Sequence, residues 1–263
     1  LFVILLLSGF FILNRTTVSY NKLSDNYLNT TVNEYSESTN KILSLEYSTC
    51  STLKEALELY EELPAESRRE YINGILKNTL KDYDGLVDAW TVWEPNALDG
   101  LDNEYANTEF HDETGRFIPY WTKVGTTIEC SALTDYDGSF WYENPLRSKT
   151  GILIDPNPYE IGGQIIWVCG VAFPIRSANG TPVGVVGIDM SLETLSELLK
   201  SAQIYDSGYL SLISSTGLKA VDYDLSTEGQ IDPDFETGET KKQFQKASKD
   251  LKTFSYYENE RGK

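Results

Sequence analysis

The sequence QIIWVCGVAFPI at residues 164–175, the turn NG at 179–180 and the sequence VGVVGID at 183–189 decide the fold. Apolar residues dominate both long stretches, and Asn-Gly favours a tight hairpin turn because both residues tolerate positive φ. We therefore predict two adjacent antiparallel strands. By the two-residue repeat of a strand, one face of the first carries Ile165, Trp167, Cys169, Val171 and Phe173.

Helices are predicted on both sides of this hairpin. Ser191 is placed to cap a helix over the leucine-rich residues 192–199. Upstream, residues 16–63 contain neither Gly nor Pro and have recurring apolar residues, which predicts one long helix or two. A further helix is predicted over residues 66–82, followed by a strand at 86–94.

Weaker patterns predict a short aromatic strand at 117–121, a hairpin made of 209–214 and 219–223, and a helix near 241–249. Residues 253–257 resemble the start of another strand. Antiparallel strands interspersed with helices predict an α+β fold with two modules, the second of them incomplete.

The first thirteen residues, LFVILLLSGFFIL, carry no charge. A membrane-spanning helix needs roughly 20 apolar residues, so this segment is short for a complete span. Because the chain begins with Leu, and because polar, acidic sequence follows, we interpret residues 1–13 as the outer end of a first transmembrane helix. A signal-peptide core and a buried helix are the alternatives. On this interpretation the chain is a fragment of a membrane-anchored protein.

The composition excludes several classes of function. With 22 Lys and Arg against 40 Asp and Glu, the formal net charge is -18, which disfavours nucleic acids and anionic surfaces as partners. A hydrophobic fraction of 40% is too high for a disordered acidic chain. One His and three scattered Cys give no metal-site pattern, and no cofactor motif is found. Asp99, Asp102 and Glu104 do not match a calcium loop and are interpreted as part of a solvated loop.

Asp189 is the most informative single residue, because it ends a strand that is otherwise apolar. A buried carboxylate needs a partner to offset its lost hydration. We expect either a cap or turn role beside the following helix or an anchor for a ligand ammonium group, with Gly187 leaving space beside it. From the pattern alone the two interpretations are about equally good.

A second cluster is SFWYE at residues 139–143. Adjacent aromatics on a segment that looks irregular are harder to explain as core than aromatics at helical spacing. Trp and Tyr faces attract cations by about 0.5 to 2 kcal/mol, depending on desolvation. Simple packing of these rings is the alternative.

Several motifs together resemble the double Cache sensor domain of bacterial transmembrane receptors, most often methyl-accepting chemotaxis proteins. They are WEPNALDG at 93–100, DETGRFIPYW at 112–121, VGVVGIDMSLETL at 183–195 and GYLSLISSTG at 208–217. The resemblance implies a long N-terminal helix over residues 14–63, a membrane-distal, ligand-binding PAS-like module over 64–204 and part of a membrane-proximal module over 205–263.

The resemblance also implies ligand-binding residues. Amino-acid-binding members have an R-x-W-Y pattern and an Asp at the end of the return strand; here the matching residues are Trp141, Tyr142 and Asp189, with Ser139 in place of the Arg. Without that guanidinium a ligand carboxylate loses its partner, whereas the aromatics and the Asp suit a cation. The sequences WEPN and TGRFIPYW resemble the amine-recognising branch. Further candidates from these regions are Trp93, Glu94, Asp135, Tyr136, Tyr159 and Glu160.

We therefore expect a non-enzymatic, extracytoplasmic sensor domain in the plasma membrane that binds a small amine or quaternary ammonium compound. The resemblance implies a homodimer formed through the long helix. An amino-acid sensor, with Arg147 as the replacement carboxylate partner, is the alternative, and the output module can be a chemotaxis protein, a histidine kinase or a cyclase. A surface hydrolase using carboxylates alone and a purely structural ectodomain are the rival classes.

Overall fold

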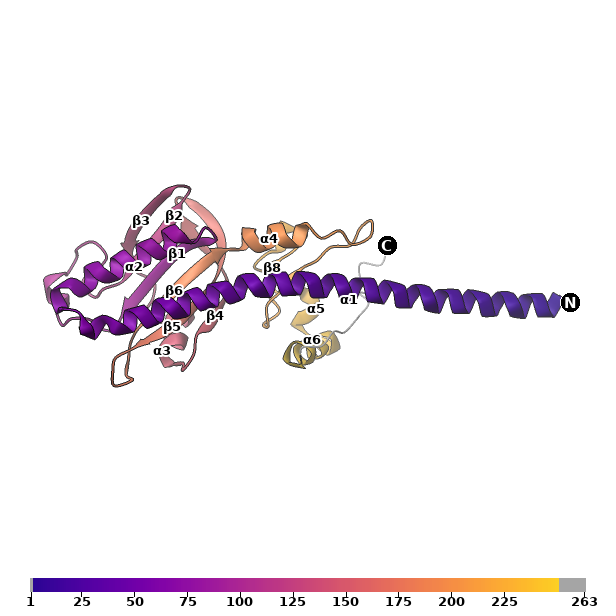
Figure 1. Ribbon diagram of the computed structural model, residues 1–263, viewed down its shortest axis with the longest axis horizontal. Coiled ribbons are helices and arrows are strands. Elements are labelled where there is room, and N and C mark those ends of the chain that lie inside the picture. The colour runs from indigo at the N-terminus through magenta and orange to yellow at the C-terminus, as the bar shows by residue number, and fades with distance from the viewer. Residues whose placement is uncertain (1, 251–263) are drawn as a thin grey trace.

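The computed structural model describes residues 2–250. A single helix, α1 (Phe2–Leu57), runs along the whole molecule and extends far beyond the large sheet at its N-terminal end (Figure 1). Two short 3-10 helices (Glu58–Glu62 and Ala65–Ser67) turn the chain at Pro64, and α2 (Arg68–Asp82) returns beside α1. Both helices were predicted. Within residues 2–250, no helix has an apolar stretch of the length that a bilayer crossing requires.

The main sheet has six antiparallel strands in the order β3-β2-β1-β6-β5-β4. Both strands of the predicted central hairpin are present, and the strand predicted at 86–94 is β1. The strands are β1 (Leu86–Trp93), β2 (Pro119–Val124), β3 (Thr127–Ala132), β4 (Ile152–Ile161), β5 (Gln164–Arg176) and β6 (Pro182–Ser191). The sequence patterns did not predict β3 and β4, and β2 begins two residues later than expected.

The β5–β6 turn forms as its sequence predicts. Gly180 has φ +86°, and Asn179 Oδ1 accepts hydrogen bonds from Ser177 Oγ at 2.8 Å and from the Thr181 amide at 2.9 Å. The pairing register shifts near the start of β6, between Ile175 and Arg176. Beyond that shift, Gly170 lies opposite Asp189.

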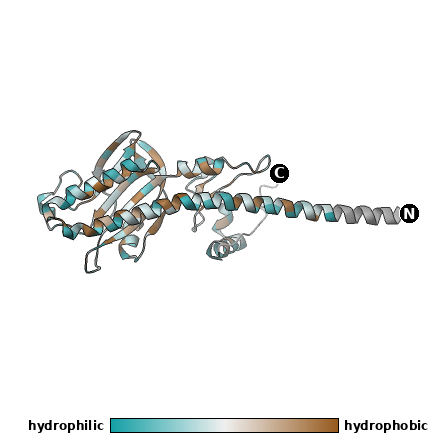
Figure 2. Ribbon diagram, viewed as in Figure 1, coloured by the Kyte–Doolittle hydropathy of each residue, from teal (hydrophilic) through white to brown (hydrophobic). Residues whose placement is uncertain are grey.

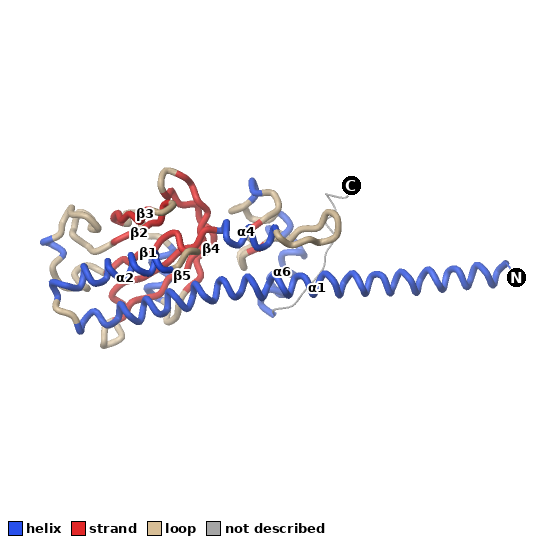
Figure 3. The backbone as a smooth tube through the Cα atoms, turned by 45° about the horizontal axis from the view of Figure 1, so that its top comes forward, coloured by secondary structure: helices blue, strands red, loops and turns tan. Residues whose placement is uncertain are grey.

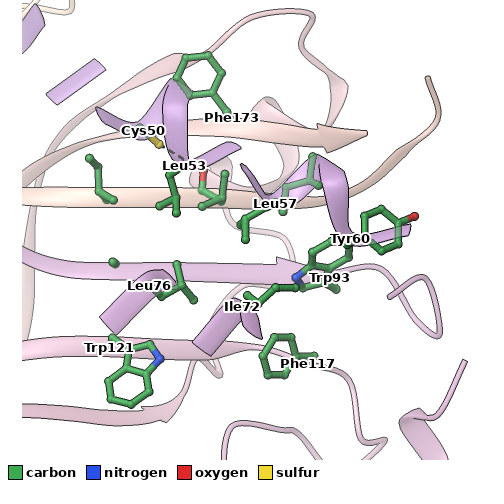
Figure 4. Close-up of a cluster of buried hydrophobic side chains, with 14 of the residues drawn as sticks. Cys50, Leu53, Leu57, Tyr60, Ile72, Leu76, Trp93, Phe117, Trp121 and Phe173 are labelled. Carbon is green, nitrogen blue, oxygen red and sulfur yellow. Dashed lines mark hydrogen bonds between the residues drawn. The ribbon is translucent and has the colours of Figure 1, made fainter. Parts of the chain in front are cut away.

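The larger core lies between α1, α2 and one face of the sheet. Figure 4 shows Leu53 and Leu57 of α1 and Leu76 of α2 directed toward the strands, with Tyr60 beside Trp93. Burying each such side chain contributes about 1.5–3 kcal/mol, so this core fixes both helices on the sheet. In Figure 2 hydrophobic residues alternate with hydrophilic ones along α1 and the strands, as expected for elements with one buried face.

The opposite face of the sheet is covered by α3 (Phe140–Arg147) and the segment before it. The sequence around 139–143 was interpreted as irregular, and this interpretation was wrong. The helix has eight residues with Pro145 inside it. So short a helix shows barely two turns of periodicity, which explains why its pattern was not recognised.

The loop between β1 and β2 is held by a buried ion-pair cluster. Arg69 of α2 donates to Asp99 from Nε and to Asp102 from a terminal nitrogen, each at 2.7 Å, and to the Gly115 carbonyl at 3.0 Å. The expectation that Asp99 and Asp102 lie in a solvated loop was therefore wrong. Their partner is about thirty residues away in sequence, so no local pattern indicates it.

A smaller C-terminal region follows α4 (Leu192–Lys200), whose Ser191 side chain caps the helix as predicted. It contains a two-stranded sheet, β7 (Leu212–Ile213) with β8 (Lys219–Val221), and the helices α5 (Pro233–Glu236) and α6 (Gly238–Asp250). Figure 3 shows this region beside the middle of α1. The strand predicted at 253–257 lies outside the described residues. The α+β fold, with a long helix followed by an antiparallel sheet, is confirmed.

Candidate functional site

A small cavity lies between the sheet and α3, on the face opposite the long helices. Its enclosed space is about 10 Å³, which is room for about one water molecule. Strands β1, β2, β4, β5 and β6 contribute to it together with α3. The lining residues are Trp90, Tyr120, Leu133, Trp141, Ile154, Asn157, Tyr159, Val168 and Asp189.

Two buried carboxyl groups lie side by side here, and Asp189 is the one of the two that lines the cavity. Asp189 on β6 and Asp88 on β1 are direct partners in the strand pairing, and they are 8% and 1% exposed. Asp189 Oδ2 accepts a hydrogen bond from Trp90 Nε1 at 2.8 Å, and Asp88 Oδ2 accepts one from the Tyr120 hydroxyl at 3.1 Å. Asp88 Oδ1 receives no hydrogen bond from any described residue.

The electrostatics of this pair are unfavourable without a cation. Burial raises the pKa of Asp88, and the neighbouring Asp189 raises it further. Burial also raises the pKa of Asp189, against the lowering effect of its hydrogen bonds with Asp88 and Trp90. Among the described residues no Lys, Arg or His forms an ion pair with either carboxyl. Such a pair holds a shared proton or attracts an external cation.

Two glycines allow this packing. A Cβ on Gly170 would lie 1.8 Å from Asp189 Oδ1, and one on Gly187 would lie 2.2 Å from the Trp90 ring. The space beside Asp189 that Gly187 was expected to leave is therefore filled by the Trp90 indole. The glycines let a carboxyl and an indole lie flat on the strands.

Aromatic rings form the walls of the cavity. Trp90 and Trp141 meet edge to face, with centroids 5.1 Å apart and an interplanar angle of 74°. Tyr120 and Tyr159 are 6.2 Å apart, and burial raises the pKa of both hydroxyls, so both stay neutral donors. Neutral rings around two carboxyl groups form an environment that favours an organic cation.

A second polar cluster, which we call the Arg116 latch, fastens α3 to the end of β1. The Arg116 guanidinium donates to Glu94 Oε1 at 2.8 Å and to the Tyr142 hydroxyl, and Tyr142 also donates to Glu94. The guanidinium lies over the Tyr136 ring, 4.6 Å from its centroid. Since Tyr142 is the neighbour of Trp141, the latch fixes the cavity wall that α3 supplies.

The predicted site residues separate into three groups. Asp189, Trp141 and Tyr159 line the cavity. Tyr142, Glu94 and Tyr136 belong to the Arg116 latch, while Asp135 is exposed but close enough to Tyr159 to raise the pKa of its hydroxyl.

The remaining candidates lie away from the cavity. Trp93 is on the helix side of the sheet, 4.9 Å from the Tyr60 ring (Figure 4), and Glu160 is exposed on β4. Arg147, the alternative carboxylate partner, is exposed and pairs with Glu143 at 2.7 Å. Ser139, at the position of the missing Arg, hydrogen-bonds the Tyr136 carbonyl.

Sequence reasoning missed Asp88, Trp90 and Tyr120. Asp88, Trp90 and Val92 alternate along β1, and the latter two pack in the core cluster on the cavity side. The alternation was available in the sequence. The signal that indicates Asp88 as a second candidate carboxylate is its position: it is the one acid on a strand of mostly apolar and aromatic residues.

Comparisons with known proteins agree with the fold described above. Residues 72–197 match the family described as methyl-accepting chemotaxis protein-like, first PDC sensor domain. This segment contains the whole six-stranded sheet and every residue around the cavity. The PAS-like sensor fold is therefore established for this part of the chain.

Individual relatives agree with this fold. The chemotaxis protein TlpQ of Pseudomonas aeruginosa is 27% identical over 176 residues, 60% of this chain and 24% of TlpQ. The extracellular domain of the putative histidine kinase mmHK1S-Z3 is 27% identical with a TM-score of 0.73, covering 85% of this chain and 80% of that one.

A third similar structure is a ligand complex. The ligand-binding domain of the Pseudomonas aeruginosa chemoreceptor PctC with GABA has a TM-score of 0.54 at 19% identity, covering 78% of each chain, which shows a shared fold. The present chain spans about a quarter of the length of TlpQ.

Proposed function

We propose that this chain is the extracytoplasmic sensor region of a plasma-membrane chemoreceptor and that its distal module binds a small ammonium compound. The fold and the match to chemotaxis sensor domains support the receptor role. The ligand class rests on this chain's own cavity. A homodimer formed through α1 belongs to the same proposal.

The observation that carries the ligand class is the buried pair Asp88 and Asp189, which no protein cation neutralises in the described residues. Two adjacent carboxylates in a dry site are costly unless a positive group meets them. An ammonium donates up to three hydrogen bonds and can reach both acids at once. The faces of Trp90, Trp141 and Tyr120 then hold its methylene or methyl groups.

The same geometry disfavours an α-amino acid. A ligand carboxylate needs a donor such as a guanidinium, and no Arg or Lys lines the cavity. Arg147 is exposed and paired with Glu143, so it offers no buried carboxylate partner. Arg116 is likewise paired, with Glu94 and Tyr142 in the latch; an amino acid is the second candidate ligand.

The size of the cavity implies that binding and conformational change are coupled. About 10 Å³ holds about one water molecule, so we expect α3 and its preceding segment to move away from the sheet when an organic amine binds. The ligand therefore stabilises an arrangement different from the closed one, which is how a sensor shifts a population of states.

Isothermal titration calorimetry tests the proposal with methylammonium, tetramethylammonium, choline and 1,4-diaminobutane, compared with GABA and the common L-amino acids. We expect binding of at least one amine, its loss in Asp189→Asn and its retention in Glu160→Gln, a control acid exposed on β4. Binding of amino acids without any amine would overturn the ligand class. Turnover of glycoside substrates by the purified chain would contradict a receptor without enzymatic activity.

A further inference from the structure

A buried glutamate on α1 receives no hydrogen bond from a described residue and does not line the cavity described above, although burial and the Asp189 charge raise its pKa. Glu46 is 5% exposed, and neither of its carboxyl oxygens has a hydrogen bond from a described residue. It occupies the sheet-facing side of α1, one turn before Cys50, where its neighbours on the helix are the buried Thr49 and the partly buried, apolar Ile42 and Leu43. An apolar residue would pack there at no electrostatic cost, so a structural role does not explain the carboxylate.

Two cavities meet at this side chain. One, of about 300 Å³, lies between α1, the turn from α2 to β1 and the end of β6; the other, of about 290 Å³, lies between α1, β4 and the β7–β8 hairpin. Each is at the lower end of the volumes typical of small-molecule sites. We call the first of them the α1 cavity.

The α1 cavity combines an apolar interior with an acidic mouth. Ile42, Leu86 and Met190 line it together with Glu46 and Thr49, and the exposed Leu45 borders it. Asp82 and Asp84 lie on the exposed turn at its mouth, and no Lys, Arg or His lines it. Asp84 is largely solvated and pairs with Lys123 at 3.3 Å. A molecule entering here meets negative potential at the rim and one desolvated carboxyl inside.

We infer that the α1 cavity is a second binding site, specific for a small primary ammonium ion with a short apolar body, and that Glu46 anchors its charge. The ammonium supplies the hydrogen bonds and positive charge that Glu46 lacks. The alkyl group occupies the space between Ile42, Leu86 and Met190. An occupant at this position touches the long helix directly, unlike a ligand beneath α3.

The site is tested by titrating the 263-residue chain with n-butylammonium chloride in an Asp189→Asn background, which silences the cavity under α3. We expect one remaining binding event, which n-butanol does not reproduce because it has no charge. Adding Glu46→Gln should weaken this binding at least about tenfold, because the buried ammonium then has no carboxylate to neutralise its charge. No binding to the Asp189→Asn chain, or equal binding after Glu46→Gln, would overturn the inference.

A pair of matched variants keeps the test valid if Glu46→Gln changes the fold. Thr194→Phe obstructs the α1 cavity without altering the carboxyl, whereas Ser215→Phe obstructs only the cavity at the β7–β8 hairpin. Binding should be lost in the first and kept in the second, and the reverse result would contradict the placement. Because Asp189 is replaced in every protein used, binding beneath α3 does not contribute to this outcome; the replacement also removes a carboxylate that adds to the effect of burial in raising the pKa of Glu46.

Discussion

Two groups of buried carboxylates in the sheet module differ in one respect, the presence of a protein cation. At the β1–β2 loop, Asp99 and Asp102 meet Arg69. Burial alone would raise the pKa of Asp99, but hydrogen bonds from Arg69 and the Leu101 amide lower it below its ordinary value. At the cavity, Asp88 and Asp189 have no such partner, and their pKa values are raised.

The difference separates a structural role from a binding role. Arg69 also lies over the Tyr105 ring at 4.2 Å and donates to the Gly115 carbonyl, so every part of that cluster is satisfied within the protein. The cavity pair is held in place by Trp90 and Tyr120 but is left without its counter-charge. On the proposed function, the acids paired with Arg69 stabilise a loop, whereas the two acids without a protein cation are candidates for ligand contact.

The largest expected effect is on the satisfied cluster. Replacing Arg69→Met leaves two buried carboxylates without a cation, which should lower the free energy of unfolding by about 3–5 kcal/mol. Urea denaturation measures this loss. Lys81→Met in the exposed last turn of the same helix is the control and should change stability by less than about 1 kcal/mol. Equal effects of the two variants would remove the contrast between the groups.

At the cavity the same kind of change should act on binding rather than folding. Asp189→Asn keeps the shape and removes one charge of an uncompensated pair, so the unfolding free energy should stay equal or rise. Amine affinity should fall at least about 30-fold, which is about 2 kcal/mol. Calorimetry and thermal unfolding of the same sample measure both. Unchanged affinity would exclude Asp189 from the site.

The two groups should also differ in their pH dependence. Because the carboxyls at the cavity have raised pKa values in the folded state, their stability penalty is absent below the unfolded value of about 3.9 and grows as pH rises through the folded pKa. Each unit of upward shift costs about 1.4 kcal/mol. The wild type should therefore lose stability relative to Asp88→Asn between acidic and neutral pH, in denaturation series without ligand.

Asp99 should show the opposite sign. Its folded pKa is lowered, so its stabilising contribution is present above the unfolded value and is lost as pH falls through the folded pKa. The difference between wild type and Asp99→Asn should accordingly shrink toward acid. If the stability difference between wild type and variant changed with pH in the same direction for Asp88→Asn and Asp99→Asn, ion pairing would not distinguish the two groups of acids. Amine affinity should rise with pH over the range in which the cavity pair ionises.

The smallest effect is expected at the Arg116 latch. Arg116→Gln removes the charge that links Glu94 with Tyr142 and so loosens the α3 wall of the cavity without touching its acids. We expect amine affinity to fall by about 1 kcal/mol, the size of one typical hydrogen bond. Arg116→Lys should restore part of it. An effect as large as that of Asp189→Asn would place Arg116 in direct contact with the ligand.

Local patterns predicted the elements with long apolar repeats and failed where tertiary contacts decide. The β5–β6 hairpin, α2 and the Ser191 cap follow from residues near one another in sequence. The eight-residue helix α3 does not, because its form depends on packing Trp141 against Trp90 on a distant strand.

The residues of the candidate site, like the elements of the fold, were only partly predictable from the sequence. Asp189 was identified because it interrupts an apolar strand, and Trp141 because it resembles a family motif. Asp88 interrupts β1 in the same way, but only the antiparallel pairing of β1 with β6 brings it opposite Asp189. Glu46 could not be identified from the sequence, because acids are common on a long polar helix. Only the packing of the sheet against α1 shows that this acid is buried.

The uninterrupted course of α1 has a mechanical consequence. At 1.5 Å per residue its 56 residues extend for about 84 Å, and from Thr16 to Leu57 no Gly or Pro introduces a hinge. On the proposed function, a displacement of α1 near Glu46 would pass along this continuous helix as an axial translation or rotation. Two adjacent glycines introduced between Tyr20 and Val32 should make the helix flexible at that point. We then expect signal transmission to be lost while ligand affinity stays the same.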